Sequence, residues 1–324
     1  PFIDGSETSV RRAIDNAIDQ GEKVSVVARE LEEDVNRQFL EAYGLSDLLV
    51  PEVPLENVAL RANYLSRFGS GGATSARQAA VTAAVLDLMS YAVGCIFGRY
   101  SVDEPGLILA DQGSTIQDFL AKVPNPTLTP DVDNVIPIVD GDWFEDDIVA
   151  RFRRFLRKAF GEKHFEENLR FVTESLGVKD LRDYFVKSFY KDHVQRYKKR
   201  PIYWLFSSPK GSFNALMYMH RYTPSTVSTV LNEYLREYRA KLESSLQHHE
   251  RLAAGGGTAR QQAAAQKEAD RLRKVLVELE AYEHDVLYPL ASQQIEIDLD
   301  DGVKANYPKF GAALKKIPGL EASE

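Results

Sequence analysis

Residues 231–288 read LNEYLREYRAKLESSLQHHERLAAGGGTARQQAAAQKEADRLRKVLVELEAYEHDVLY, and this stretch indicates the architecture of the chain most clearly. Two sets of apolar side chains in it recur at alternating intervals of four and three residues: Leu231, Leu235, Tyr238 and Leu242, and then Leu272, Val275, Leu279, Tyr282 and Val286. Such heptad spacing is typical of two helices that pack along one apolar seam. Gly255 to Gly257 separate the two halves. We therefore predict a coiled-coil-like antiparallel helical hairpin over residues 231–290, with a glycine turn at its tip.

The sequence at the start of the chain is also helical in pattern. Residues 1–67 form a predicted N-terminal helical segment, in which apolar side chains recur every three or four residues from Val10 to Tyr43. We expect this helix to be interrupted near Gly21 and to end at Tyr43, with Gly44 as its C-terminal cap. The stretch FGSGGAT at residues 68–74 predicts an exposed flexible loop.

Residues 68–230 are predicted to be a helical core with a small β element and a basic, aromatic region that faces DNA. The apolar run Ala79–Tyr100 predicts a helix at the centre of the core, in which Cys95 is inert. The proline-rich residues 101–147 predict ordered loops with one short strand at Val135–Val139. Further helices are expected at Asp146–Phe160, Glu162–Leu176 and Asp180–Tyr190.

Residues 291–324 form a predicted C-terminal strand and turn. The residues from Ile295 to Leu299 alternate between apolar and polar before Asp301-Gly302, which is the pattern of a strand that enters a tight turn. The alternation would place Glu296, Asp298 and Asp300 on one face, and carboxylates hold a metal ion only where they converge. Because like charges are common on an exposed face, we predict no metal site. The fold class expected is mainly α with a small β element, a helical domain that carries a long antiparallel helical hairpin.

The composition is that of an acidic globular protein. The chain has 324 residues, a formal net charge of -8 and a sequence pI of about 5.4. A hydrophobic content of 44% and a charged content of 27% are ordinary for a soluble protein, and we see no membrane span or signal peptide. One cysteine cannot form an intrachain disulfide, so we predict a cytoplasmic protein. The acidic balance still permits one basic face, because nucleic-acid binding responds to local charge.

Residues 187–222, KSFYKDHVQRYKKRPIYWLFSSPKGSFNALMYMHRY, predict such a basic face. No acidic side chain occurs between Asp192 and Glu233. Lysine and arginine neutralise phosphates, hydroxyl groups donate hydrogen bonds to them, and aromatic rings stack on bases. The turn Ser207–Ser212 combines hydroxyls, a lysine and unhindered amides, which suits a phosphate. The predicted DNA-binding residues are Lys191, Arg196, Tyr197, Lys198, Lys199, Arg200, Tyr203, Trp204, Ser207, Ser208, Lys210, His220 and Arg221.

A second interpretation of the same stretch needs no ligand. Tyr203, Trp204 and the two residues after them could form a buried strand, with the lysines solvated around it. The residues alone leave both interpretations open. The chain has no P-loop, no HExxH and no paired CxxC, so it carries none of these motifs for phosphate transfer or for metal binding.

Four longer stretches resemble one protein family. They are Ser90–Ser101 (SYAVGCIFGRYS), Tyr197–Ser208 (YKKRPIYWLFSS), Ala215–Tyr222 (ALMYMHRY) and Gln294–Lys304 (QIEIDLDDGVK). With these stretches in this order, the chain from about residue 30 to residue 311 resembles the C-terminal half of the PglX family, the adenine-specific DNA methyltransferases of BREX phage-defence systems.

The resemblance implies a bacterial enzyme that methylates adenine N6 at a short non-palindromic site with S-adenosylmethionine. The catalytic motifs of that family lie upstream of the region that this chain resembles. Asn125-Pro-Thr127 is not the Asn-Pro-Pro-aromatic motif that binds a flipped adenine. We therefore expect a non-catalytic fragment with no cofactor of its own. Because the chain opens on Pro1, we expect it to be a piece of a longer protein.

The resemblance also implies the partners. We expect the chain to engage double-stranded DNA, as a recognition or clamp region, and to act with an upstream methyltransferase domain and with other BREX proteins, away from membranes. Leu31–Leu45 looks like the segment that closes the recognition region in related methyltransferases, so much of the base-reading surface would precede Pro1. The alternative function is a protein–protein docking module for other defence components, with the helical hairpin as its contact.

Overall fold

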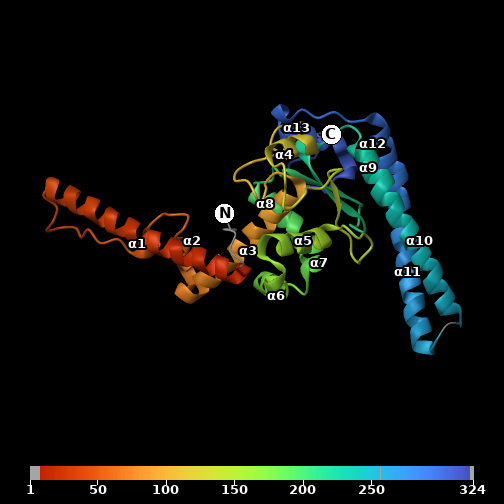
Figure 1. Cartoon of the computed structure of the whole chain (residues 1–324), viewed down its shortest axis with the longest axis horizontal. Helices are drawn as coiled ribbons and strands as arrows, with labels where there is room; N and C mark the ends of the chain where they lie inside the picture. The colour runs from red at the N-terminus through yellow and green to blue at the C-terminus, as the bar shows by residue number, and fades with distance from the viewer. Residues whose placement is uncertain (1–7, 256, 322–324) are drawn as a thin grey trace. The chain divides into compact units, whose positions relative to one another are not determined.

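A computed structural model of the chain describes residues 8–255 and 257–321 (Figure 1), so Gly256 of the predicted glycine turn and the outermost residues of both terminal segments lie outside the described residues. The described residues are mainly helical with one small sheet, which confirms the predicted fold class. They form two compact units, Pro1–Tyr91 with Leu156–Val178 and Ala92–Phe155 with Lys179–Glu324. The division into four segments at residues 67, 230 and 290 stays a prediction.

The first unit is built from helices. They are α1 (Val10–Ala42), α2 (Tyr64–Phe68), the first part of α3 (Ala73–Phe97), the last part of α5 (Ile148–Phe160) and α6 (Phe165–Leu176). The N-terminus of α1 is held by α6, because the Val10 N–H donates a 2.8 Å hydrogen bond to Oδ1 of Asn168. At the other end Gly44 has a φ of +66°, and the Leu45 N–H donates to the Leu40 carbonyl at 2.8 Å. This arrangement confirms the predicted glycine cap.

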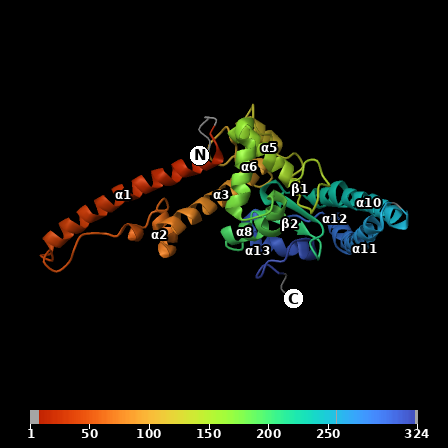
Figure 2. The ribbon, with the colours of Figure 1, turned by 90° about the horizontal axis from the view of Figure 1, so that it is seen from below.

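Two predictions for the first unit are wrong. Gly21 does not interrupt α1, which is one continuous helix (Figure 2). Gly21 is buried, and a Cβ on it would lie 2.7 Å from the carbonyl oxygen of Ala62, so a close approach of backbone explains this glycine. The stretch at residues 68–74 is not a loop throughout, because Phe68 ends α2, a short 3-10 turn occupies Gly69–Gly71, and α3 begins at Ala73.

Helix α3 begins six residues earlier than predicted and ends at Phe97, where Gly98 takes a φ of +81°. Its buried side chains confirm that it is a core helix, and Cys95 is buried among them. Contrary to the prediction from sequence, α3 is long and apolar enough to span a bilayer by length and composition alone. Because 56% of its apolar window is buried inside the protein, its packing is that of a core helix.

The second unit contains an antiparallel sheet with the strand order β1-β3-β2. Its strands are β1 (Val135–Pro137), β2 (Tyr203–Ser207) and β3 (Asn214–Tyr218). Every strand residue is buried, which explains why the strands are continuous apolar runs rather than alternating patterns. The predicted strand at Val135–Val139 is confirmed in part: β1 ends at Pro137, and one further bond, from the Ile138 N–H to the Asn214 carbonyl at 2.8 Å, follows it.

The helices of the second unit include three continuous runs. The elements are α4 (Ile116–Lys122), α7 (Leu181–Tyr184), α8 (Tyr190–Arg196), α9 (Thr226–Thr229), α10 (Arg236–Gly255), α11 (Ala259–Tyr282), α12 (Tyr288–Gln293) and α13 (Val303–Asn306). Segments of π-helix join α7 to α8 at Phe185–Phe189, α9 to α10 at Val230–Leu235, and α11 to α12 at Glu283–Leu287. Helix α4 was not predicted, although Thr115 and Asp118 form a capping box at its start.

Helices α10 and α11 run side by side and form the predicted hairpin (Figures 1 and 2). The predicted seam residues Leu235, Leu242, Leu272 and Leu279 are buried. At the base of the hairpin the heptad pattern fails. The pattern predicts that Val286 is buried, but Val286 is half-buried and the next residue, Leu287, is buried. The π-helical segment there adds a residue to the turn and shifts the register.

The predicted strand from Ile295 to Leu299 is wrong. Residues 295–298 lie outside any strand, and side chains satisfy their backbone instead. The Ile295 carbonyl accepts from the Tyr222 hydroxyl at 2.7 Å, and the Leu299 N–H donates to Oε1 of Gln112 at 2.6 Å. The alternating pattern reflects exposure, because Ile295, Ile297 and Leu299 are half-buried while Glu296 and Asp298 are exposed. Across residues 8–255 and 257–321 no group of three or more His, Cys, Asp or Glu side chains could hold a metal ion.

Candidate nucleic-acid interface

The turn after α8, residues 197–200, presents the cations of the basic stretch. Lys198 and Lys199 have φ angles of +50° and +62°, so two consecutive lysines lie in the left-handed region. The turn is closed by a 2.8 Å hydrogen bond from the Lys199 N–H to the Val194 carbonyl and by one of 2.9 Å from the Arg200 N–H to the Tyr197 carbonyl. A side chain in this region costs about 1–2 kcal/mol per residue. The backbone here is strained, and it carries lysines where glycine would fit without strain.

The cations of this turn are open to solvent. Lys198, Lys199 and Arg200 are exposed, as are Arg196 at the end of α8 and Lys191 on the same helix. Within the described part of the chain, Lys198, Lys199 and Arg200 form no ion pair with a carboxylate. Their positive charge also lies at the C-terminus of a helix, where the helix dipole favours cations. The turn can therefore offer its charge to an anion.

The serine-rich turn between β2 and β3 does bind an anion, but the anion is part of the protein. One carboxylate oxygen of Glu278 accepts from Oγ of Ser208 at 2.6 Å and from the Lys210 N–H at 2.7 Å. The other accepts from Oγ of Ser212 at 2.6 Å. Burial raises the pKa of Glu278, but these hydrogen bonds together hold it below its ordinary value. The Glu278 carboxylate thus occupies the place predicted for a phosphate.

Beside this turn lies a pocket of about 420 Å³, which we call the lysine pocket. Its lining includes five lysines and no carboxylate: Lys187, Lys191, Lys210, Lys315 and Lys316. Lys315 and Lys316 belong to the C-terminal tail. The tail lies against β2, because the Lys315 N–H donates to the Leu205 carbonyl at 2.8 Å and Leu314 forms a β-bridge with Phe206. Lys187 is paired with Asp183 on its own helical run.

Two aromatic residues predicted to meet DNA are buried in the sheet. Trp204 donates from Nε1 to the Pro201 carbonyl at 3.0 Å, and its ring meets Phe310 edge-on at 5.5 Å. The Tyr203 ring stacks on Phe97 with 5.2 Å between centroids. Both side chains are at most 1% exposed, so neither presents a face on which a base could stack. For these residues the structure matches the alternative interpretation of a buried strand.

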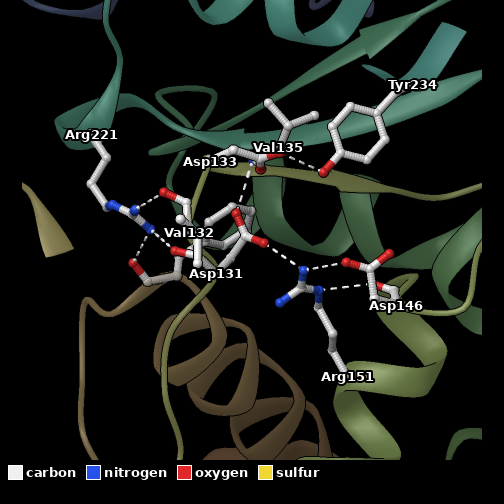
Figure 3. Close-up of polar contacts among 9 residues, drawn as sticks. Asp131, Val132, Asp133, Val135, Asp146, Arg151, Arg221 and Tyr234 are labelled. Carbon is white, nitrogen blue, oxygen red and sulfur yellow. Dashed lines mark hydrogen bonds and ion pairs between the residues drawn. The ribbon is translucent and has the colours of Figure 1, made fainter. Parts of the chain in front are cut away.

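Arg221 is also buried, in a network of charged groups (Figure 3). Its guanidinium donates to three carbonyls, those of Phe97 at 3.2 Å, Asp131 at 2.8 Å and Val132 at 3.0 Å. Burial lowers the pKa of Arg221, and the facing Asp131 carboxylate opposes that change. Arg151 pairs with the same carboxylate at 2.5 Å. Arg221 therefore fixes the loop before β1, as the dashed contacts to this loop in Figure 3 show.

The two histidines near the basic stretch are held neutral. Nε2 of His193 accepts a 3.1 Å hydrogen bond from the Tyr203 N–H, which requires an unprotonated nitrogen. Burial, with Arg196 and Arg99 nearby, lowers the pKa of His193 to about 3. Burial, together with Arg99, likewise lowers the pKa of His220 to about 4. A neutral His220 cannot neutralise a phosphate.

The predicted DNA-binding residues thus separate into three groups. Lys191, Arg196, Lys198, Lys199, Arg200 and Lys210 are exposed; Tyr197 and His220 are half-buried; and Tyr203, Trp204, Ser207, Ser208 and Arg221 are buried. The prediction missed Lys187, Lys315 and Lys316 of the lysine pocket. The sequence contains the adjacent pair at residues 315–316, but no local pattern shows that the tail returns to β2.

Comparison with known proteins gives two similar sequences, and no family model matches the chain. Over 285 residues the chain is 37% identical to the adenine-specific methyltransferase BrxX of Escherichia coli O9:H4 (strain HS). The aligned region covers 82% of this chain and 23% of that protein. Over 300 residues it is 34% identical to the adenine-specific methyltransferase PglX of Lacticaseibacillus casei (strain Zhang). This aligned region covers 90% of this chain and 23% of that protein. The chain spans about a quarter of the length of these curated relatives.

Proposed function

Because this chain is homologous to one part of the adenine-specific methyltransferases BrxX and PglX, we propose that it is the C-terminal, DNA-engaging region of a BREX adenine-N6 methyltransferase. In this proposal the chain holds the phosphate backbone of duplex DNA and does no chemistry itself. The catalytic domain upstream binds S-adenosylmethionine and reads the target bases. The whole enzyme acts in the bacterial cytoplasm with other BREX proteins.

The observation that carries this proposal is the exposed turn at residues 197–200. Three consecutive cations lie there without carboxylate partners among the described residues, in a chain whose net charge is -8. Lysine and arginine contacts to phosphates supply most of the sequence-independent affinity of proteins for DNA. Contacts of this kind orient a protein on the duplex without reading sequence, which is the task expected of a clamp. Exposed Lys191, Arg196 and Lys210 would extend the same contact.

The experiment is duplex-DNA binding by the 324-residue chain across a series of salt concentrations, followed by fluorescence anisotropy. The variant is Lys198→Ala/Lys199→Ala/Arg200→Ala. If each side chain neutralises one phosphate, the variant binds more weakly at every salt concentration, and its salt slope is shallower by up to about three. The matched control is Arg260→Ala/Lys267→Ala/Lys274→Ala, which removes the same charge from exposed positions on α11.

The control separates local contact from net charge. The proposal requires the control to keep the salt slope of the original chain. It fails if neither the original chain nor the control binds DNA at low salt, and it also fails if both variants lose the same affinity.

A second candidate function is docking to another protein, and a specific observation favours it. Along α1 the apolar side chains Val27, Leu31, Val35 and Phe39 are between 48% and 62% exposed, at intervals of four residues. Such spacing gathers them on one side of the helix. The hairpin predicted for this role is less suited, since Val277 is the only exposed large apolar side chain that the described residues of α10 and α11 carry. Docking by α1 is therefore the form of this alternative that the surface supports.

The test of the docking alternative is co-purification of the chain with each of the other BREX proteins from a reconstituted set. We expect Leu31→Ser/Phe39→Ser to abolish a complex that the original chain forms, because the substitution removes large apolar area from one helix face. Val277→Ser on the hairpin is the control. A complex that survives the α1 change would exclude this surface.

A further inference from the structure

The lysine pocket concentrates positive charge, and three of its lysines, Lys187, Lys315 and Lys316, have no part in the duplex-holding proposal. Five lysines line one concave site of about 420 Å³, and no aspartate or glutamate lines it. Apart from Lys187, which pairs with Asp183, these lysines form no ion pair within the described part of the chain. Like charges gathered in this way repel one another and attract an anion. A concave site with this electrostatic character favours a ligand that carries several negative charges.

Hydrogen bonds hold the main chain of two pocket lysines, Lys210 and Lys315, in place. The Lys210 N–H is held by Glu278, and the Lys315 carbonyl accepts a 2.6 Å hydrogen bond from the Tyr307 hydroxyl. The adjacent bond from the Lys315 N–H to the Leu205 carbonyl ties the tail to β2. On the helical run, Lys187 lies within the π-helical segment Phe185–Phe189 and Lys191 follows it; such segments are often found at functional sites. Because the main chain is held, only the side chains must adjust to a ligand.

The size and mixed lining of the pocket indicate the class of ligand. Pockets of roughly 300–1,000 Å³ are typical of small-molecule sites, and a single phosphate group is much smaller than that. Leu205, Ile317 and Pro318 add apolar surface to the lining. Lysine binds phosphate well as a compact point charge. We propose that the lysine pocket binds a phosphorylated small molecule of nucleotide size, with its phosphates on the lysines and its ring system against this apolar surface.

This inference goes beyond the DNA-holding function and does not depend on it. Lys191 and Lys210 belong both to the predicted DNA-contacting set and to the pocket. The phosphate could therefore come from a free nucleotide, as we propose, or from the DNA backbone. Lys315 and Lys316 distinguish the two sources, because they lie in the pocket and outside the turn at residues 197–200.

The experiment is isothermal titration of ATP, without magnesium, into the 324-residue chain at low salt. We expect saturable binding of one ATP per chain. In Lys315→Gln/Lys316→Gln the loss of two charge-assisted contacts should weaken binding at least about tenfold. The matched control, Lys267→Gln/Lys274→Gln on α11, removes the same charge from exposed positions and should stay within twofold of the original chain. Circular dichroism of each variant checks that the helices remain formed.

Two results would overturn the proposal. One is the absence of saturable ATP binding to the original chain up to millimolar concentration, and the other is an equal loss in the control variant. Duplex DNA titrated into the same variants identifies the source of the phosphate. If Lys315→Gln/Lys316→Gln weakens DNA binding and ATP does not bind, the pocket takes a backbone phosphate and the small-molecule proposal is wrong. If ATP binds in the pocket and the triple variant at residues 198–200 leaves DNA binding unchanged, the DNA-holding proposal fails and this one stands.

Discussion

The turn at Ser207–Ser212 and the turn at residues 197–200 differ in where their polar groups find partners. In the first, the donors of Ser208, Ser212 and the Lys210 backbone all meet the carboxylate of Glu278. In the second, the cations are exposed and the lysine backbone is strained. The first turn joins the sheet to α11, whereas Lys198, Lys199 and Arg200 of the second form no ion pair among the described residues. The difference teaches that a polar turn indicates a ligand site only when its own protein leaves it unpartnered.

The largest expected effect is a loss of stability when Arg221 is replaced, a residue that was predicted to contact DNA and is buried. Arg221→Ala should lower the free energy of unfolding by about 3 kcal/mol, because it removes the donor to the buried carbonyls of Phe97 and Asp131 and leaves the Asp131 carboxylate with one fewer cation nearby. Urea unfolding followed by circular dichroism measures the change. Arg200→Ala, at an exposed position, is the control and should change stability by less than about 0.5 kcal/mol. Equal effects of the two substitutions would remove the distinction between the buried and the exposed arginine.

Glu278→Ala should have the next largest effect. Removal of the carboxylate leaves the Ser208 hydroxyl buried and without its acceptor, while Lys210 and Ser212 can regain water, so we expect a loss of about 2 kcal/mol. The same urea experiment measures it, with Glu280→Ala on the exposed face of α11 as the control. A loss no greater than that of the control would show that the β2–β3 turn does not need its internal anion.

The buried His193 predicts a dependence of stability on pH. Its pKa is lowered from 6.5 to about 3 by burial, so below pH 6.5 the unfolded chain binds a proton that the folded chain does not. Stability should therefore fall as pH falls from 6.5 toward 5, by up to about 1.4 kcal/mol per pH unit for this group. His220 adds to the same window, since its pKa is also lowered. His193→Gln keeps an acceptor for the Tyr203 N–H and should make the dependence shallower, with the share of His220 remaining; an unchanged slope would contradict the assignment.

The smallest expected effect concerns the strained turn itself. Lys199→Gly removes a side chain from the left-handed region, so stability should stay the same or rise by up to about 1 kcal/mol. The same change removes a cation, so DNA affinity should fall. Lys274→Gly, inside α11, is the contrasting control and should lose about 1 kcal/mol through helix propensity. A marked loss of stability in Lys199→Gly would show that this lysine serves packing.

Much of the fold follows from local pattern, and much of the site does not. The hairpin seam and the Gly44 cap were predictable because each depends on residues near in sequence. The strand expected after Ile295 was wrong because side chains from distant segments satisfy its backbone. The same limit applies to the site: nothing near Ser208 in sequence shows that Glu278 will fill its turn, or that Lys315 will join the lysine pocket.

The central claim is that the exposed lysines of the turn at residues 197–200 touch DNA phosphates. Lysine footprinting tests it most directly: the chain is reductively methylated with and without saturating duplex DNA, and modification of each lysine is measured by mass spectrometry. The account predicts that DNA protects Lys198 and Lys199, while Lys267 and Lys274 on α11 are modified equally in both samples. Equal modification of Lys198 and Lys199 with and without bound DNA would contradict it.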